Sequence, residues 1–495
     1  MISITIICIL ISLASGKNID RMSLMDLTNS LLQMEETMRK LDISEDSAIF
    51  LGNTKAGRST LINYIIGNTL KAEKKSRFDP VVIVKADEKS KGPIIGDGPT
   101  SVTTTPTKWY SRNLPNLALW DTPGFEDNRG SIQDITNAFS IFTLVKSVKS
   151  LKIILVIDIK DITEDNTQQF LSLLTSIENL FGNNFTHFFP STTVIFTKVA
   201  RNIGGNPIDY EYVNYHLESH FLSDTNLRWS EIAKNFTHYL IKNTKRVALF
   251  RKMMKTGYVT KDEVDVGIFE AINSSTKTEA NLLQTVRPSI SPSSMISLYQ
   301  SQEELVLEEG ITEIASILSL KANKTEETLN YLENRRELEK ITKELQPIEM
   351  ALEETLTIKN DLRKKMNSLI NSYDNIKAGI DHTKLLKNAQ LIKSTEDKLY
   401  VNISKHLEFS IDAIAFSMKL KMRTLNSIAT MKLDGKNDTS NATIIVTPEE
   451  RNICLEILTE FTKVIDEDND SFLYKIKTFF FSFYYGIKLT INCGN

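Results

Sequence analysis

Apolar residues in the first part of the chain come in short runs, and helical patterns separate these runs. Six runs rich in β-branched and other apolar residues indicate strands, at residues 47–51, 81–86, 117–120, 151–159, 191–197 and 246–250. Amphipathic helical patterns lie at residues 60–67, 132–148, 167–180 and 210–222. Continuous apolar strands are typical of a sheet that is covered on both faces. The alternation predicts an α/β domain over residues 47–286, with a mostly parallel sheet and helices on both faces.

The pattern changes after residues 287–295, a segment rich in Pro and Ser that we interpret as a linker. Beyond it, apolar residues recur at steps of three and four on charged segments, as in an a/d helical stripe. Two such stripes are Leu338, Ile341, Leu345, Ile348 and Leu352, and Met366, Leu369, Tyr373, Ile376 and Ile380. Pro347 is expected to kink its helix or to start a new one. Residues 296–495 are predicted to form an α-helical domain with coiled-coil character.

Residues 1–16 form an apolar segment that ends in small residues. Ala14 and Gly16 match a secretory cleavage site, so one interpretation is a signal peptide. A second is a short uncleaved anchor, because the basic residues Lys17 and Arg21 follow the segment and would stay in the cytosol. A third is a buried N-terminal strand or helix. Residues 17–46 then carry a helical pattern that precedes the first strand.

Composition narrows the class of protein only slightly. The chain has 495 residues, 24% of them charged and 41% hydrophobic, which is typical of a globular protein. Its net charge of −3 gives no indication of nucleic acid as a partner. The three cysteines, Cys8, Cys454 and Cys493, form neither a disulfide framework nor a metal-binding motif.

A glycine-bounded loop follows the first predicted strand and precedes the first predicted helix. It reads Gly52, Asn53, Thr54, Lys55, Ala56, Gly57, Arg58, Ser59, Thr60, which fits the phosphate-binding pattern G-x-x-x-x-G-K-S except at position 58. In such loops backbone N–H groups and the helix start face phosphate oxygens, and the serine hydroxyl binds Mg²⁺. Arginine is wider than lysine and planar, so Arg58 is expected to weaken binding or misplace the last phosphate. Lys55 offers a second positive charge.

The segment Asp121-Thr122-Pro123-Gly124 follows the strand predicted at residues 117–120. A D-x-x-G sequence at a strand end places its carboxylate beside Mg²⁺ and its glycine N–H near the last phosphate. A threonine-rich loop lies between the two motifs, and we expect one of its threonines, Thr104, to close over the metal. The predicted metal ligands are therefore Ser59, Thr104 and Asp121.

These motifs, in this order, resemble those of P-loop GTPases of the translation-factor-related class. The segments "DTPGFED" and "SVTTT" are most similar to septins, immunity-associated GTPases and dynamin-like proteins. The resemblance covers residues 47–250 and implies GTP or GDP with Mg²⁺ as cofactors. It also implies that Thr197 and Lys198, at the end of the fifth strand, belong to the guanine-binding motif.

Two further residues depart from the family pattern. Ala200 stands where the family has an aspartate that accepts hydrogen bonds from guanine, and losing a charged acceptor costs about 1.5–3 kcal/mol. Phe125 stands where Ras-like proteins have the glutamine that orients water. The resemblance therefore implies weak discrimination between bases and, if hydrolysis occurs at all, a slow GTP hydrolase.

Two functions from different classes remain open. The first is a nucleotide-dependent switch or assembly protein, whose helical domain transmits the nucleotide state or forms a homo-oligomer. The second is a pseudo-GTPase that acts as an interaction protein, either secreted or membrane-associated. The aromatic stretch at residues 478–487 adds a membrane surface as a candidate partner.

Overall fold

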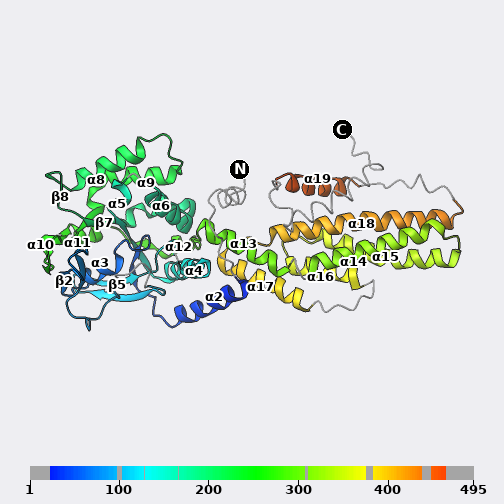
Figure 1. Cartoon of the computed structure of the whole chain (residues 1–495), viewed down its shortest axis with the longest axis horizontal. Helices are drawn as coiled ribbons and strands as arrows, with labels where there is room; N and C mark the ends of the chain where they lie inside the picture. The colour runs from blue at the N-terminus through cyan, green and yellow to red at the C-terminus, as the bar shows by residue number, and fades with distance from the viewer. Residues whose placement is uncertain are drawn as a thin grey trace. The chain divides into compact units, whose positions relative to one another are not determined.

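The computed structural model describes residues 23–96, 103–127, 129–164, 167–306, 310–374, 383–436 and 447–463 (Figure 1). The described chain divides into two compact units, an α/β unit at Asp26–Met295 and a helical unit from Ile296 onward. The prediction of a mostly parallel sheet with helices, followed by a helical region, is confirmed.

The central sheet of the α/β unit has the strand order β12-β10-β7-β6-β1-β5-β4. Strand β1 pairs in parallel with both β5 and β6, and β7 pairs in parallel with β6 and β10. Strands β4 and β12 are antiparallel edge strands, and β13 pairs antiparallel with β6. The bounds are β1 Asp46–Leu51, β4 Thr107–Ser111, β5 Leu114–Asp121, β6 Ser150–Asp158, β7 Thr192–Val199, β10 Val247–Arg251, β12 Asp265–Val266 and β13 Thr278–Glu279.

Helices precede and connect these strands. The main ones are α2 (Leu24–Arg39), α3 (Arg58–Ile65), α4 (Ser131–Ser147), α6 (Gln168–Phe181), α8 (Tyr210–His216), α9 (Glu231–Lys242) and α11 (Ile268–Ser274). Shorter helices are α5 (Lys160–Thr163), α7 (Phe185–Phe188), α10 (Lys261–Val264) and α12 (Ala280–Leu283). Helix α8 continues into a π-helical turn at Leu217–Leu222, and a two-stranded ribbon, β8 (Asn202–Ile203) with β9 (Asn206–Pro207), follows β7.

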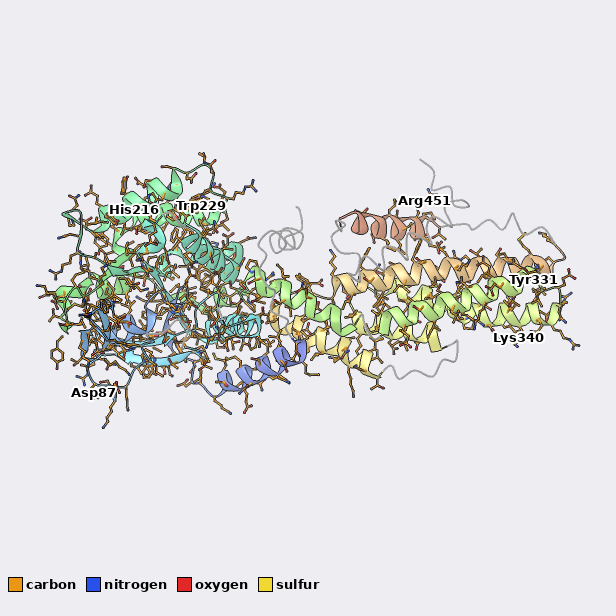
Figure 2. The ribbon with its side chains drawn as sticks, viewed as in Figure 1. Asp87, His216, Trp229, Tyr331, Lys340 and Arg451 are labelled. Carbon is orange, nitrogen blue, oxygen red and sulfur yellow. The ribbon has the colours of Figure 1, made fainter. Side chains whose placement is uncertain are left out.

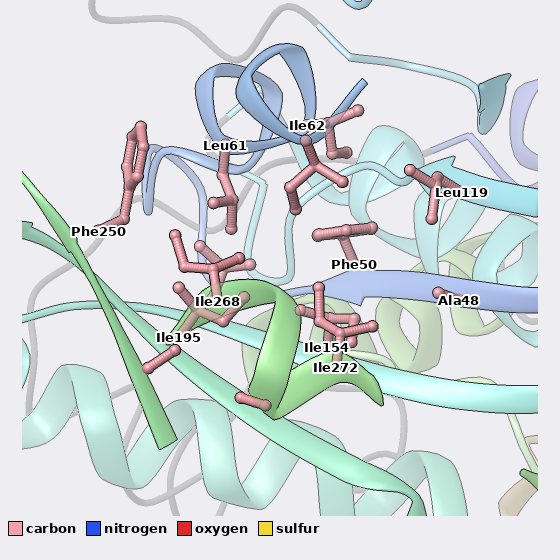
Figure 3. Packing of buried hydrophobic residues seen from close by; sticks show 14 of the residues in the cluster. Ala48, Phe50, Leu61, Ile62, Leu119, Ile154, Ile195, Phe250, Ile268 and Ile272 are labelled. Atoms are coloured by element: carbon pink, nitrogen blue, oxygen red, sulfur yellow. The ribbon is translucent and has the colours of Figure 1, made fainter. Parts of the chain in front are cut away.

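The central strands are buried on both faces, as their continuous apolar runs predict. On one face, Phe50 and Ile154 of the sheet pack with Leu61 and Ile62 of α3 and with Ile272 of α11 (Figure 3). The alternate residues of β1 and β6, which point to the other face, are also fully buried: Ile49, Leu51, Ile153, Leu155 and Ile157. Burial on both faces holds the strand ends in place, and the candidate site lies at those ends.

The run at residues 81–86 is a strand, but it lies outside the central sheet. It forms β3 (Val82–Lys85), which pairs with β2 (Leu70–Glu73), and β2 pairs with β11 (Gly257–Tyr258) in a separate three-stranded sheet. The second strand of the central sheet in chain order is the edge strand β4, whose half-exposed, polar residues gave no strand pattern in the sequence.

The helical unit consists of long helices that pack along one another. They are α13 (Pro292–Val306), α14 (Thr312–Tyr331), α15 (Arg335–Thr357), α16 (Leu362–Asp374), α17 (Thr383–Leu399), α18 (Lys405–Leu433) and α19 (Pro448–Lys463). Helix α15 packs most extensively against α18 and then against α16. The stripe residues Leu338, Leu345, Ile348 and Leu352 are buried, as are Met366 and Leu369. Ile376 and Ile380 lie outside the described residues.

Pro347 lies inside α15, and the helix does not end there. Its side chain is exposed, so the carbonyl of Lys343, which proline leaves without an N–H donor, lies on the solvent side of the helix. The sequence predicts either a kink or a new helix at Pro347. The expectation of a new helix is wrong, because α15 continues through Pro347.

Ion pairs join the helices of this unit where side chains are buried. Lys365 of α16, 1% exposed, donates to both carboxylate oxygens of Asp412 at 2.7 Å. Glu450, at the start of α19, pairs with Lys419 at 2.8 Å and with Arg423 at 2.9 Å. The Glu450 carboxylate also accepts from the N–H of Thr447, and the Thr447 hydroxyl accepts from the N–H of Glu450. These two reciprocal hydrogen bonds cap the start of α19.

Within the described part of the chain, no helix combines the length and the apolar character needed to cross a bilayer. The apolar segment at residues 1–16, the aromatic stretch at 478–487, Cys8 and Cys493 all lie outside the described residues. Cys454 of α19 is buried and forms no disulfide with another described residue.

Candidate functional site

The loop between β1 and α3 lies where the order of the central sheet reverses. The chain leaves β1 towards β5 on one side and leaves the adjacent β6 towards β7 on the other, so the two connections diverge at the carboxyl ends of β1 and β6. In open α/β sheets this position is the usual site of ligand binding. The topology therefore favours the same loop that the sequence motif indicates.

Glycine at positions 52 and 124 is required by close packing of the backbone. A Cβ atom at Gly52 would collide with the carbonyl oxygen of Val156 in β6. A Cβ atom at Gly124 would lie 2.9 Å from the backbone N of Thr54. The loop after β5 thus lies directly against the loop after β1, and the N–H of Phe125 donates to the Gly52 carbonyl at 3.3 Å.

The loop turns through left-handed conformations at Lys55 (φ 69°) and Gly57 (φ 92°). Gly57 then serves as N-cap of α3, and the first hydrogen bond within the helix runs from Leu61 N–H to the Gly57 carbonyl. The N–H groups of Arg58, Ser59 and Thr60 precede that bond, so they have no acceptor within the helix. This part of the loop can therefore present several N–H donors to an anion.

Arg58 points back into its own loop. Its guanidinium donates to the carbonyl oxygen of Gly52, and the residue is only 7% exposed. Burial lowers the pKa of Arg58, and the negative charges of Asp121 and Asp127 oppose that shift. The side chain of Lys55 is exposed instead. Of the two cations expected at the phosphates, Arg58 lies inside the loop and Lys55 lies at the surface.

Asp121, the last residue of β5, faces the start of α3. Its Oδ2 accepts from the Ser59 hydroxyl at 2.9 Å and from the Thr103 hydroxyl at 3.5 Å. Its other oxygen, Oδ1, is buried and has no hydrogen-bond partner. Burial raises the pKa of Asp121, against the effect of Arg58 and Ser59. The threonine that reaches Asp121 is Thr103, and the expected Thr104 is exposed.

Asn53 and Thr197 hold the loop from the sides. The Asn53 amide donates to the carbonyl of Gln169 at 2.8 Å, so its side chain points to α6 and its Oδ1 is buried without a partner. The Thr197 hydroxyl donates to the carbonyl of Ala56 at 2.6 Å. Both side chains donate to backbone carbonyls, so they hold the loop in place and do not offer these donors to a ligand inside it.

Lys198, at the end of β7, connects the loop to β6. Its ammonium group donates to the carbonyl of Lys55 at 2.9 Å and pairs with Asp158 at 2.6 Å. Nearby, burial and the charge of Asp158 raise the pKa of Asp161 to about 6. Ala200 is half-buried and offers no acceptor beyond its carbonyl, which accepts from Arg251. The structure thus places Lys198 beside the loop, and its charged partner is Asp158.

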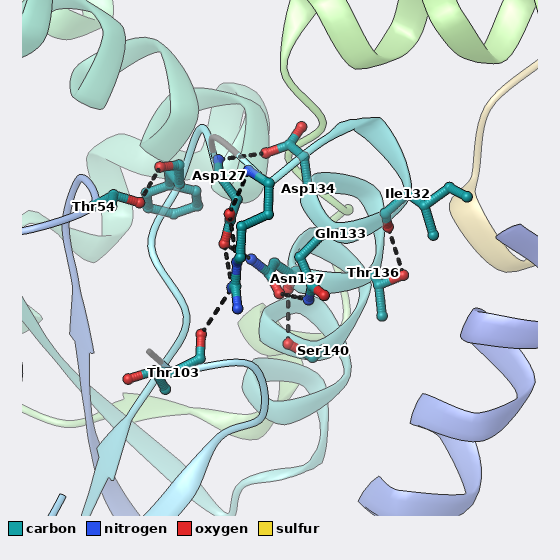
Figure 4. Close-up of polar contacts among 11 residues, drawn as sticks. Thr54, Thr103, Asp127, Ile132, Gln133, Asp134, Thr136, Asn137 and Ser140 are labelled. Atoms are coloured by element: carbon teal, nitrogen blue, oxygen red, sulfur yellow. Dashed lines mark hydrogen bonds and ion pairs between the residues drawn. The ribbon is translucent and has the colours of Figure 1, made fainter. Parts of the chain in front are cut away.

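A polar network that the sequence analysis missed follows Gly124 (Figure 4). Asp127 accepts from Arg129 Nε at 2.8 Å and from the amide of Asn137 in α4 at 2.8 Å. Arg129 also donates to the carbonyl of Thr103 at 3.2 Å. Burial alone would raise the pKa of Asp127, but the hydrogen bonds from Arg129 outweigh it and hold the pKa below its usual value. The network joins the loop after β5 to the threonine loop. The only feature of the sequence that could have indicated this network is the run of charged residues after "DTPG".

The donor set at Asp121 fits a cation that binds partly through water. One carboxylate oxygen is unpartnered, and the hydroxyls of Ser59 and Thr103 donate to the other oxygen of the same carboxylate. Within the described ranges, no group of three or more His, Cys, Asp or Glu side chains is placed to hold a metal. A metal at this position would therefore depend on a bound phosphate for its remaining ligands.

No protein-family model matches the chain, and the curated proteins contain no match to it. The case for a function therefore depends on the geometry of the loop and its neighbours.

Proposed function

We propose that the α/β unit binds a purine nucleotide with Mg²⁺ at the β1–α3 loop, as a P-loop GTPase does, and that the protein is a guanine-nucleotide-dependent switch or assembly protein. The observation that carries this proposal is Asp121. It is a buried carboxylate at the end of β5, beside the topological switch point of the sheet. Its Oδ2 lies 2.9 Å from the hydroxyl of Ser59 at the start of α3, and its Oδ1 has no partner. A buried carboxylate oxygen without a partner is costly, and a bound cation would remove that cost.

Each part of the site has a role in this proposal. Backbone N–H groups from Lys55 to Thr60 bind the phosphates, and Ser59 with Asp121 holds Mg²⁺, with Thr103 as the third hydroxyl or carboxylate group. When bound, the metal neutralises charge on the phosphates. Gly124 packs closely against Thr54 of the loop, and its N–H is assigned to the last phosphate. Lys198 supports the loop and offers its aliphatic stem to a base.

Turnover, in this proposal, is slow. Phe125, at the position of the water-orienting glutamine, is 4% exposed and packs into the core. Arg129 is the first basic residue after the D-x-x-G segment, and it is paired with Asp127. The helical unit acts as the region that transmits the nucleotide state or associates with a second copy. The location of the protein, in the secretory pathway or on the cytosolic side of an anchor, depends on residues 1–16 and stays a prediction.

A second candidate function is a pseudo-GTPase that keeps the fold and binds partners without nucleotide. The observation that favours it is Arg58, whose guanidinium donates to the Gly52 carbonyl and lies within the loop. An arginine in that position stabilises the loop without a phosphate. The absence of a carboxylate at Ala200 agrees with this alternative.

Titration of the full chain with fluorescent GTP and ATP analogues, with and without Mg²⁺, separates the two functions. The nucleotide proposal predicts saturable, Mg²⁺-dependent binding below ~100 μM, within the range of typical substrate constants. Ser59→Ala is expected to weaken binding at least tenfold. Thr60→Ala is the matched control, because it removes a neighbouring hydroxyl and keeps the backbone N–H. If wild type and both variants bind no nucleotide at this concentration, the pseudo-GTPase is the better account.

A further inference from the structure

The small sheet β11-β2-β3 carries an exposed turn that takes no part in the nucleotide site. The turn comprises residues 74–81, between β2 and β3, and residues 74–80 are all exposed. One face of this sheet is fixed to the α/β unit, because Leu70 and Ala72 are buried. The turn is therefore held by a packed sheet and projects beyond it. Figure 1 shows β2 at the periphery of the α/β unit.

A second exposed loop lies at the same end of this sheet. Strand β11 is antiparallel to β2, with Gly257 opposite Ala72 and Tyr258 opposite Lys71. The residues that precede Gly257 therefore continue beside the residues that follow Ala72. This register places Met254 and Lys255 next to the turn at residues 74–81.

Positive charge is concentrated at this end of the small sheet. Residues 74–81 and 252–258 together contain five Lys or Arg and one Asp, in a chain whose net charge is −3. Lys74, Arg77, Lys252 and Lys255 are all exposed. A local excess of this size attracts an anionic surface and is weakened by salt.

Large apolar side chains are exposed among these charges. Phe78, near the tip of the turn, is 82% exposed, Tyr258 is 71% exposed and Met254 is 65% exposed. The guanidinium of Arg77 lies 4.5 Å from the centre of the Phe78 ring. An exposed phenylalanine beside arginine and lysine is the combination found in segments that enter the boundary between lipid headgroups and acyl chains.

We propose that this end of the small sheet, residues 74–81 with 252–258, binds a membrane surface that contains anionic lipids. Lys74, Arg77, Lys252 and Lys255 contact the headgroups, and Phe78 and Met254 enter the apolar boundary. A bilayer accommodates both apolar side chains, whereas methionine does not stack on bases as an aromatic residue does. For this reason the observations favour lipid over single-stranded nucleic acid.

Co-sedimentation of the full chain with vesicles tests this proposal without nucleotide, so its outcome is independent of the proposed function. Binding is expected to vesicles of phosphatidylcholine with phosphatidylserine and not to phosphatidylcholine alone. Each basic residue beside an anionic surface raises the partition about fivefold, so Lys74→Gln with Arg77→Gln should lower it roughly twentyfold. Phe78→Ser should lower it about tenfold or more.

Matched control variants lie in the helical unit, where Figure 2 labels Tyr331 and Lys340. Tyr331 is 88% exposed, and Arg336 and Lys340 are exposed, so Tyr331→Ser and Arg336→Gln with Lys340→Gln make equivalent changes elsewhere. The proposal predicts that these controls bind vesicles as wild type does. It is overturned if the turn variants and the controls bind equally, or if the turn variants lose single-stranded nucleic acid and keep the vesicles.

Discussion

Asp121 of the α/β unit differs from the buried carboxylates of the helical unit in the hydrogen bonds that it makes. In the helical unit, Lys365 makes two hydrogen bonds to Asp412, and Glu450 is paired with both Lys419 and Arg423. In the α/β unit, Asp121 keeps one oxygen without a partner, and among the described residues it is the only carboxylate with such a buried atom. A buried ion pair is costly to break, while a buried carboxylate oxygen without a partner lowers stability and is available to a ligand. The difference supports our proposal that Asp121 serves a ligand and that the ion pairs are structural.

The largest effect is expected from breaking a paired charge. Lys365→Met leaves Asp412 buried without its cation, which should lower the free energy of unfolding by about 3–5 kcal/mol. Chemical denaturation of the full chain, followed through the helical signal, measures this loss. The double variant Lys365→Met with Asp412→Leu should recover most of it, because an apolar pair needs no partner. Equal losses in the single and double variants would mean that the pair is not the source of the effect.

Glu450→Gln should have a smaller but clear effect on the same unit. It removes the charge that pairs with Lys419 and Arg423 and weakens the cap of α19, at a cost of about 2–4 kcal/mol. The neighbouring Glu449→Gln is the control, because Glu449 is exposed in the same helical turn. Hydrogen exchange of α19 measures both variants, and similar exchange in the two would contradict the pairing role of Glu450.

The stability that Glu450 contributes should depend on pH. Burial would raise the pKa of its carboxyl, but the hydrogen bonds from Arg423 and Lys419 outweigh burial and lower the pKa from 4.5 to about 2. A carboxyl whose pKa is lower in the folded state stabilises the fold at pH values above its pKa in the unfolded state. This contribution is lost as the pH falls through its pKa in the folded state. The difference in unfolding free energy between wild type and Glu450→Gln should therefore be constant above pH 4.5 and shrink towards pH 2. A constant difference across this range would contradict the assignment.

The smallest effect is expected at Arg58. Lysine in its place is narrower and can reach a phosphate without filling the loop, so Arg58→Lys should tighten nucleotide binding by up to about tenfold. Titration with the fluorescent analogue measures the change. If the variant binds more weakly than wild type, the loop has adapted to arginine and Arg58 itself contacts the phosphate.

Much of the fold follows from local patterns in the sequence. Strands β1 and β6 were predictable because both of their faces are buried, which leaves continuous apolar runs. Strand β4 was not, because it is a half-exposed edge with the polar sequence "TKWYS". The strand at residues 82–85 was predicted as a strand, but its place in a second sheet depends on pairing with β2 and distant β11, which local patterns do not encode.

The candidate site was predictable in outline and not in detail. The spacing of Gly52, Ser59, Asp121 and Gly124 indicated which segments meet, because parallel strands end at one edge of the sheet. The sequence could not show that Thr103 faces Asp121 while Thr104 faces solvent, because neighbouring residues of a loop differ only in backbone dihedral angles. The direction of Arg58 was equally hidden, because it depends on the position of the Gly52 carbonyl across the loop.

The most direct test of this account is the melting temperature of Asp121→Asn, compared with wild type, with and without Mg²⁺ and GTP. If Asp121 is a buried carboxylate kept for a ligand, the variant without ligand should melt at the same temperature as wild type or higher, because a neutral amide costs less to bury than a carboxylate with an unpartnered oxygen. Ligand should then raise the melting temperature of wild type and leave that of the variant unchanged. A variant that melts well below wild type without ligand, together with a wild type that does not respond to Mg²⁺ and GTP, would contradict the account and assign Asp121 to the structure alone.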